Sequence, residues 1–120
     1  MKPYQDARVE GEKLAKQYAE LEEADQVDFY NGLEGYYSVL GHNKKQEAIA
    51  VLIEKNDHKI YVYQLDKGIS QDKAATISRE KGASDIEKIT FGRYQDKPIW
   101  EVKSGNQYYL VDFETGAVIQ

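Results

Sequence analysis

The sequence of 120 residues contains no cysteine, which excludes disulfides, thiolate nucleophiles and cysteine-based zinc sites. It has only 16 basic residues against 21 acidic ones, so its net charge of −5 offers little attraction to nucleic-acid phosphates or to an anionic membrane surface. No apolar run approaches the roughly 20 residues of a membrane helix, and no signal peptide is recognisable. The remaining composition, with 41% apolar and 31% charged residues, is typical of a globular protein.

Aromatic residues are abundant: ten tyrosines, three phenylalanines and one tryptophan favour β-sheet. Apolar positions near the N-terminus recur at spacings of three and four, which predicts a helix over residues 3–22. Short gaps between the strand-like segments that follow indicate antiparallel hairpins. These predicted strands cover residues 26–30, 35–40, 47–53 and 60–65.

The pattern then restarts near Asp66–Ile69. Ser70 is a suitable N-cap and Gly82 a suitable stop, which predicts a second helix over residues 70–81. The order of one helix and four strands thus occurs twice, which indicates a degenerate tandem duplication of an α+β unit. The predicted strands of the second half cover residues 86–91, 99–103, 107–113 and 117–119.

Candidate catalytic and metal-binding residues are few. His42 and His58 fall in predicted turns without the spacing of a zinc or facial-triad site, so no metal is predicted. Asp112 and Glu114 flank the closing turn, where an open hairpin does not supply the burial that tunes an acid–base pair. We therefore expect these two carboxylates to solvate and stabilise the turn.

Ser70 and Lys73 match the S-x-x-K pattern of penicillin-binding enzymes. The accompanying S-D-N and K-T-G motifs are absent, and 120 residues do not accommodate a transpeptidase domain. Ser70 is therefore expected to be an N-cap. No glycine-rich phosphate-binding pattern occurs either, so the chain is predicted to use no cofactor and not to be an enzyme.

A protein-contact surface is predicted on the tyrosines of the sheet faces turned away from the helices, because aromatic residues dominate interface hot spots. Alternation alone does not say which parity faces outward, and Trp100 is equally compatible with the core. The candidates are Tyr36, Tyr61, Tyr63, Tyr94 and Tyr108.

Several strand-and-turn segments together resemble the TseB/YpmB-like family of cell-wall elongation regulators, over nearly the whole chain. The resemblance implies a fold of two cystatin-like units, one over residues 1–66 and a PepSY-type unit over residues 67–120. The segments that carry it are YNGLEGYYSVLG (30–41), KGIS (67–70), PIWEVK (98–103) and YYLVDFETGAVI (108–119).

The same resemblance implies a function. It predicts a non-catalytic extracytoplasmic protein-binding module, the ectodomain of a membrane-anchored Gram-positive envelope protein that regulates cell-wall elongation through a penicillin-binding protein. The abrupt start at MKPYQD suggests that an N-terminal anchor precedes this segment. PepSY units are also linked to peptidase inhibition and to propeptides, so a peptidase-inhibitory or propeptide-like module is the alternative.

Overall fold

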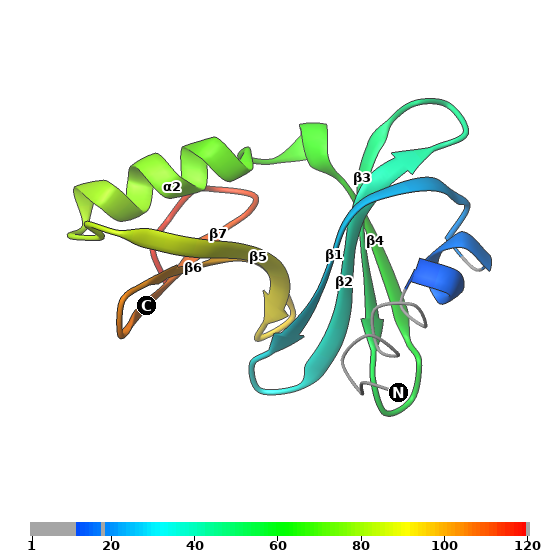
Figure 1. Ribbon diagram of the computed structural model, residues 1–120, viewed down its shortest axis with the longest axis horizontal. Coiled ribbons are helices and arrows are strands. Elements are labelled where there is room, and N and C mark those ends of the chain that lie inside the picture. Colours follow the sequence, from blue (N-terminus) through cyan, green and yellow to red (C-terminus); the bar gives the residue numbers. More distant parts are fainter. Residues whose placement is uncertain (1–11, 18, 120) are drawn as a thin grey trace. The chain divides into compact units, whose positions relative to one another are not determined.

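The computed structural model describes residues 12–17 and 19–119. The chain divides into two compact units, Met1–Leu65 and Asp66–Gln120. The first contains a four-stranded sheet and the second a three-stranded sheet (Figure 1). All strand pairs in both sheets are antiparallel, as the short predicted turns require.

The sheet of the first unit has its strands in chain order, so each strand pairs with the next along the sequence. The predicted segments 35–40, 47–53 and 60–65 match three of these strands apart from their ends. The four strands are β1 (Leu21–Asn31), β2 (Gly35–Asn43), β3 (Ala48–Glu54) and β4 (Ile60–Gln64).

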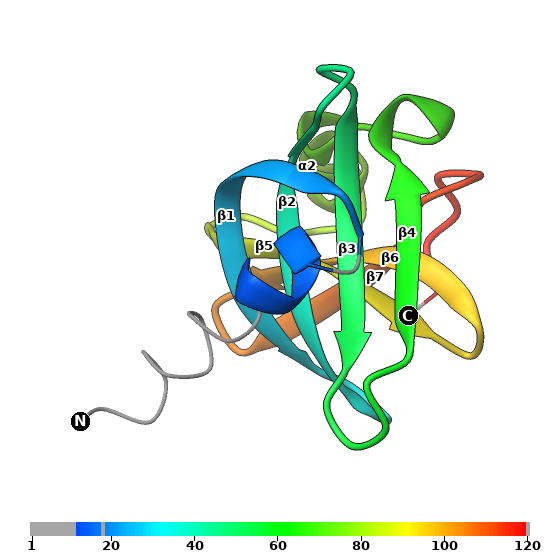
Figure 2. The same cartoon turned by 90° about the vertical axis from the view of Figure 1, so that its right-hand side faces the viewer.

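Residues 12–17 are helical and lie against one face of this sheet (Figure 2). Ala15 is fully buried in the core of the unit, and Leu14 packs against that core. On the solvent side of the helix, Lys16 Nζ lies 3.0 Å from Glu12 Oε2, as their i,i+4 spacing predicts. The strand residues of the core cluster are Leu21, Val27, Tyr37, Val39, Ile49, Val51 and Ile53.

The predicted helix over residues 3–22 is wrong at its C-terminal end. Residues 3–11 and 18 lie outside the described part of the chain, but Leu21 already begins β1. Glu20 has a φ of 58°, which is incompatible with a continuing right-handed helix. Strand pairing and the burial of Leu21 therefore override the helix-favouring residues at this point.

β1 is longer than the predicted strand over residues 26–30 for a related reason. Its register against β2 shifts twice, between Leu21 and Glu23 and between Ala24 and Gln26. Each shift adds a residue to one strand and breaks the two-residue alternation of side chains. The first half of β1 therefore lacks the pattern by which a strand is recognised in a sequence.

The second unit places one helix on a sheet of order β5–β6–β7. Ser70 caps the helix as predicted, because its Oγ accepts a hydrogen bond of 3.0 Å from the N–H of Lys73. Gly82 follows the helix with a φ of 116°, a conformation that glycine adopts without strain. The elements are α2 (Gln71–Glu80), β5 (Ile86–Tyr94), β6 (Lys97–Ser104) and β7 (Gln107–Asp112), preceded by a 3-10 helix, Leu65–Lys67.

The predicted strand over residues 117–119 is not a strand. Val118 forms an isolated antiparallel bridge with Val111, and the N–H of Ile119 donates a hydrogen bond of 2.7 Å to the carbonyl of Leu110. Three residues after a tight turn support one bridge but no ladder. The fold class is nevertheless confirmed: the protein is α+β, with a helix on an antiparallel sheet in each of two cystatin-like units.

Trp100 belongs to the core of the second unit, where it is 2% exposed. Its Nε1–H donates a hydrogen bond of 3.0 Å to the carbonyl of Ile69, just before α2. Phe91 packs edge-on against Trp100 with a centroid distance of 4.9 Å, and Phe113 packs edge-on against Phe91 at 5.2 Å. A Cβ at Gly68 would lie 2.6 Å from the Phe113 ring, so only glycine fits at position 68 without a shift of its neighbours.

Replacing Ser70 with alanine is expected to lower the free energy of unfolding of the second unit by about 1 kcal/mol, because the Lys73 N–H loses its acceptor. Ser70→Asp keeps an acceptor and should remain close to the parent. Trp100 is the single tryptophan, so urea unfolding followed by its fluorescence reports on this unit. An unchanged transition midpoint in Ser70→Ala would contradict the capping role.

Candidate functional site

Three of the five candidate tyrosines share one face of the first sheet. Val39 and Val51 belong to the core cluster under the helix, so their neighbours in β2 and β3 point to the opposite face. The strand register places Tyr36, Tyr61 and Tyr63 on that opposite face. The structure thus brings these three residues together on the side turned away from residues 12–17.

Tyr30 of β1 joins the same face, although the sequence analysis did not include it among the candidates. Tyr30 lies opposite Tyr36, and their ring centroids are 6.4 Å apart. Tyr36 and Tyr61 meet edge-on, with centroids 6.3 Å apart and an interplanar angle of 71°. We call Tyr30, Tyr36, Tyr61 and Tyr63 the tyrosine face.

The members of the tyrosine face differ in exposure. Tyr30 and Tyr36 are only 2% and 3% exposed, whereas Tyr61 and Tyr63 are half-buried. The hydroxyl of Tyr36 donates a hydrogen bond of 3.1 Å to the carboxylate of Glu34. Tyr30 and Tyr36 are therefore the buried members of the tyrosine face, and Tyr61 and Tyr63 carry its accessible surface.

Carboxylates gather at the end of the sheet where Tyr36 lies. Glu54 is directly opposite Tyr36 in the register. Desolvation raises the pKa of Glu54 above its ordinary value, and the negative charges of Asp57 and Glu34 raise it further. The positive charge of Lys59, whose Nζ lies 3.7 Å from Asp57 Oδ2, offsets part of this effect.

The other two candidate tyrosines lie on the second sheet. Tyr94 pairs with Lys97, and Tyr108 pairs with Lys103. The indole of Trp100 reaches the segment before α2, so Trp100 lies on the helix side of β6. Lys97 and Lys103 are an odd number of residues from Trp100 and therefore point to the other face. Their partners Tyr94 and Tyr108 lie on that same face, away from the helix. Tyr108 is 53% exposed and Tyr94 is half-buried.

Glu101 shares that face in the central strand β6. It pairs with Thr90 and Leu110, both buried, and is itself half-buried. Burial raises the pKa of Glu101 above its ordinary value, and the positive charge of Lys88 offsets only part of this effect. The face therefore combines aromatic and basic side chains with the carboxylate of Glu101, whose ionised form burial disfavours.

His42 and His58 do not form a common site. His42 Nδ1 lies 3.0 Å from Asp25 Oδ2 near the start of β3, whereas His58 occupies the turn after its end. The seven residues of β3 separate them by about 20 Å. Among residues 12–17 and 19–119, no group of three or more histidine, cysteine, aspartate or glutamate residues is placed to hold a metal ion.

Asp112 and Glu114 do not face one another as an acid–base pair. Asp112 is 5% exposed, and its Oδ1 accepts hydrogen bonds from the N–H groups of Glu114 at 2.8 Å and Thr115 at 3.1 Å. Glu114 itself is exposed. The expected role of Asp112 in stabilising the closing turn is confirmed, and its lone pairs are directed at the backbone.

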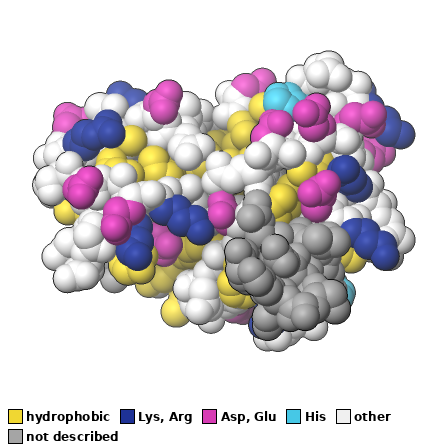
Figure 3. Space-filling model, in the orientation of Figure 1, with side chains coloured by type: hydrophobic (Ala, Val, Ile, Leu, Met, Phe, Trp, Pro, Cys, Tyr) yellow, Lys and Arg dark blue, Asp and Glu magenta, His cyan; other side chains and the backbone are white. Residues whose placement is uncertain are grey.

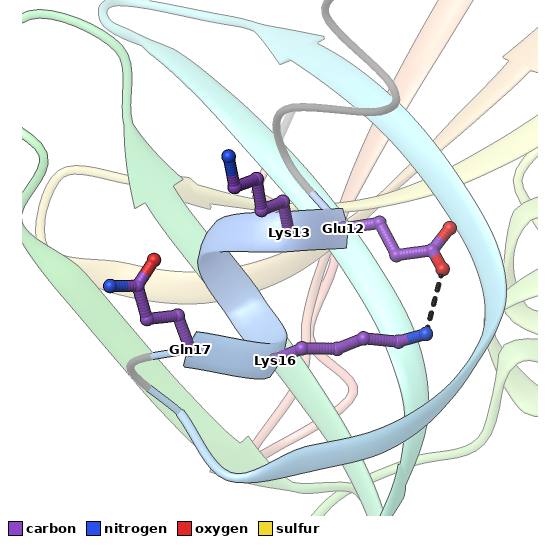
Figure 4. Close-up of a pocket in the computed structure, with 4 residues that line it drawn as sticks. All are labelled: Glu12, Lys13, Lys16 and Gln17. Carbon is purple, nitrogen blue, oxygen red and sulfur yellow. Dashed lines mark ion pairs between the residues drawn. The ribbon is translucent and has the colours of Figure 1, made fainter.

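A surface hollow lies beside the helical turn of residues 12–17 (Figure 4). Its described lining consists of Glu12, Lys13, Lys16 and Gln17, and the ion pair between Glu12 and Lys16 spans one side. All four come from one helical turn, so no second described element contributes a reactive group. Figure 3 shows charges of both signs interspersed over the visible face.

No helix within the described part of the chain is both long and apolar enough to cross a membrane. The fold and the surfaces together define a two-unit α+β protein whose sheets present tyrosines on the faces away from their helices.

Comparison with known proteins places the chain in a family. Residues 10–54 match the cell wall elongation regulator TseB-like domain. A protein of Bacillus subtilis (strain 168) described as "Probable cell wall elongation regulator TseB" is 37% identical over 114 residues, which cover 88% of this chain and 70% of that protein. The chain belongs to the TseB-like family of cell wall elongation regulators, so the resemblance found in the sequence is confirmed.

A solved structure supports the same assignment. The YpmB protein from Bacillus subtilis superimposes with a TM-score of 0.79 and is 31% identical, with 100% of this chain and 97% of that chain covered. The likeness therefore extends over both units, whereas the domain match ends at Glu54, the last residue of β3 in the first unit.

Replacing Glu101 with glutamine is expected to stabilise the second unit at pH 7. Burial raises the folded-state pKa of Glu101 above its unfolded value, so the ionised form disfavours folding and protonation removes that cost as the pH falls. The gain should shrink as the pH approaches about 4, where the unfolded carboxylate also protonates. Trp100 fluorescence in urea at several pH values measures it.

The exposed Glu114→Gln is the matched control for charge and should show no comparable gain at pH 7. A loss of stability in Glu101→Gln at pH 7 would mean that attraction to Lys88 outweighs the burial cost.

Proposed function

We propose that this chain is a non-catalytic, extracytoplasmic protein-binding module that regulates cell-wall elongation by contacting an envelope protein, with a penicillin-binding protein as the leading partner. In this proposal a membrane anchor outside the chain holds it at the outer face of a Gram-positive cell. The accessible side chains of the tyrosine face, Tyr61 and Tyr63, supply the contacts together with Tyr94 and Tyr108.

The observation that carries the proposal is the identity of 37% with the Bacillus subtilis protein described as a probable cell wall elongation regulator. At this level of identity, and with most of both chains aligned, a shared role is the simplest expectation. Since the cell wall is assembled outside the membrane, an extracytoplasmic location is the expected one for that role.

The chemistry of the sheet faces supports a protein partner. Tyrosine provides a large contact area at a small cost in conformational entropy, and it recurs at the centres of interfaces. Tyr61, Tyr63 and Tyr108 reach solvent from sheet positions, where the backbone is rigid.

A complementation experiment tests the proposal. The segment encoding this chain replaces the matching part of the Bacillus subtilis relative, behind that protein's own N-terminal region, in cells that lack the relative. Restored cell width and length would support a shared role. Failure to restore them, despite stable production at the cell surface, would contradict it.

The same cells and purified proteins test the contact residues. Tyr108→Ala is expected to weaken binding to a purified elongation penicillin-binding protein by tenfold or more, in line with about 2 kcal/mol for an aromatic hot spot. Leu33→Ala removes a 71% exposed apolar side chain from a hairpin turn and should leave binding unchanged. Binding to an envelope peptidase in place of the synthase would favour the peptidase-inhibitory alternative.

A further inference from the structure

Asn31 is a candidate modification site, because it is the only asparagine of the chain that is followed by a glycine. The other asparagines, Asn43, Asn56 and Asn106, precede lysine, aspartate and glutamine. The side-chain amide of an asparagine can be attacked by the backbone nitrogen of the next residue. A glycine at that next position leaves the nitrogen accessible and its dihedral angles free, because it has no Cβ.

The structure presents this pair to solvent. Asn31 is the last residue of β1, where it pairs with Gly35, and both Asn31 and Gly32 are exposed. Among residues 12–17 and 19–119, the Asn31 side chain has no hydrogen-bond partner. Its amide is therefore free to turn towards the backbone of the next residue.

Asn43 shows the opposite arrangement. Its side-chain amide donates a hydrogen bond of 2.9 Å to Glu47 Oε1. Its Oδ1 accepts hydrogen bonds from the N–H groups of Lys45 at 2.9 Å and Glu47 at 3.0 Å. The Asn43 side chain is thus held in place, and a lysine follows it, so it lacks both features that favour the attack.

Packing of the tyrosine face requires glycine at position 32. A Cβ there would lie 2.6 Å from Cε2 of Tyr30, a buried member of that face. A larger residue would have to displace the Tyr30 ring, which a close-packed interior resists. The burial of this ring and the accessible nitrogen after Asn31 therefore depend on the same missing side chain.

We propose that Asn31 is a site of spontaneous deamidation in the folded protein, with water as the second reactant. The backbone nitrogen of Gly32 forms a bond to Cγ of Asn31, while the bond from Cγ to the side-chain nitrogen breaks. The departing nitrogen takes up the proton of the Gly32 N–H and leaves as ammonia, so that a cyclic succinimide remains. Water then opens the ring at either carbonyl, which gives aspartate or isoaspartate at position 31.

Both products change the closing pair of the β1–β2 hairpin. Each carries a negative charge close in sequence to Glu34, whose carboxylate accepts the hydrogen bond from the Tyr36 hydroxyl. Isoaspartate also adds a methylene to the backbone opposite Gly35. Because strand register depends on backbone geometry at the turn, we expect isoaspartate to destabilise the hairpin more than aspartate does.

Tandem mass spectrometry of the 120-residue chain, incubated for days at neutral pH, tests the proposal. Asn106 is the internal reference, because it is exposed in the turn between β6 and β7 and precedes glutamine. Asn31 should deamidate at least about tenfold faster than Asn106, a difference of about 1.4 kcal/mol in the activation barrier. Equal rates at the two positions would overturn the proposal.

The same incubation in guanidinium chloride separates the effect of the fold from that of the local sequence. Asn31 should react at comparable rates in the folded and unfolded chains, whereas Asn43 should be slower in the folded chain because its amide is held. If folding lowers the rate at Asn31 to that of Asn106, the hairpin keeps the amide away from the Gly32 nitrogen and the proposal is wrong.

Asn31→Gln is the matched control. It keeps an amide at position 31, but its extra methylene requires a larger ring, so modification at this position should cease over the same period. Persistent conversion at position 31 in this variant would contradict attack by the Gly32 nitrogen.

The aged parent also tests the effect on the hairpin. Ion exchange separates its isoaspartate form, whose midpoint of thermal unfolding, followed by circular dichroism, should lie below that of Asn31→Asp. An isoaspartate form as stable as Asn31→Asp would refute the expected loosening of the closing pair.

Discussion

Side-chain alternation along β2 and β3 is the constraint on which both faces of the first unit depend. Val39 and Val51 lie fully buried beneath the helical turn of residues 12–17, so every neighbouring residue in these strands must point the other way. That other face receives Tyr36 and, through the register with β4, Tyr61 and Tyr63. A slip of one residue would exchange the two sets and expose the core.

The second unit satisfies the same constraint with different chemistry. Trp100 lies on the helix side of β6, and its Nε1–H donates a hydrogen bond to the carbonyl of Ile69, in the segment before α2. This leaves the alternate residues of β6, including Glu101, on the face that carries Tyr108. The same core that fixes the helix therefore also decides which tyrosines are presented, and it does so in each unit separately.

The sequence by itself determined the features that depend on near neighbours: the helix cap at Ser70, the turn held by Asp112, three strands of the first sheet and the family likeness. Their signals lie within a few residues of one another. Only the tertiary structure decided that β1 begins at Leu21, that residues 117–119 form a bridge in place of a strand, and that Tyr30 joins the tyrosine face while Tyr61 keeps accessible surface. These outcomes depend on pairing between segments that are distant in the chain, and on which parity of each strand the helix covers, neither of which a local pattern encodes.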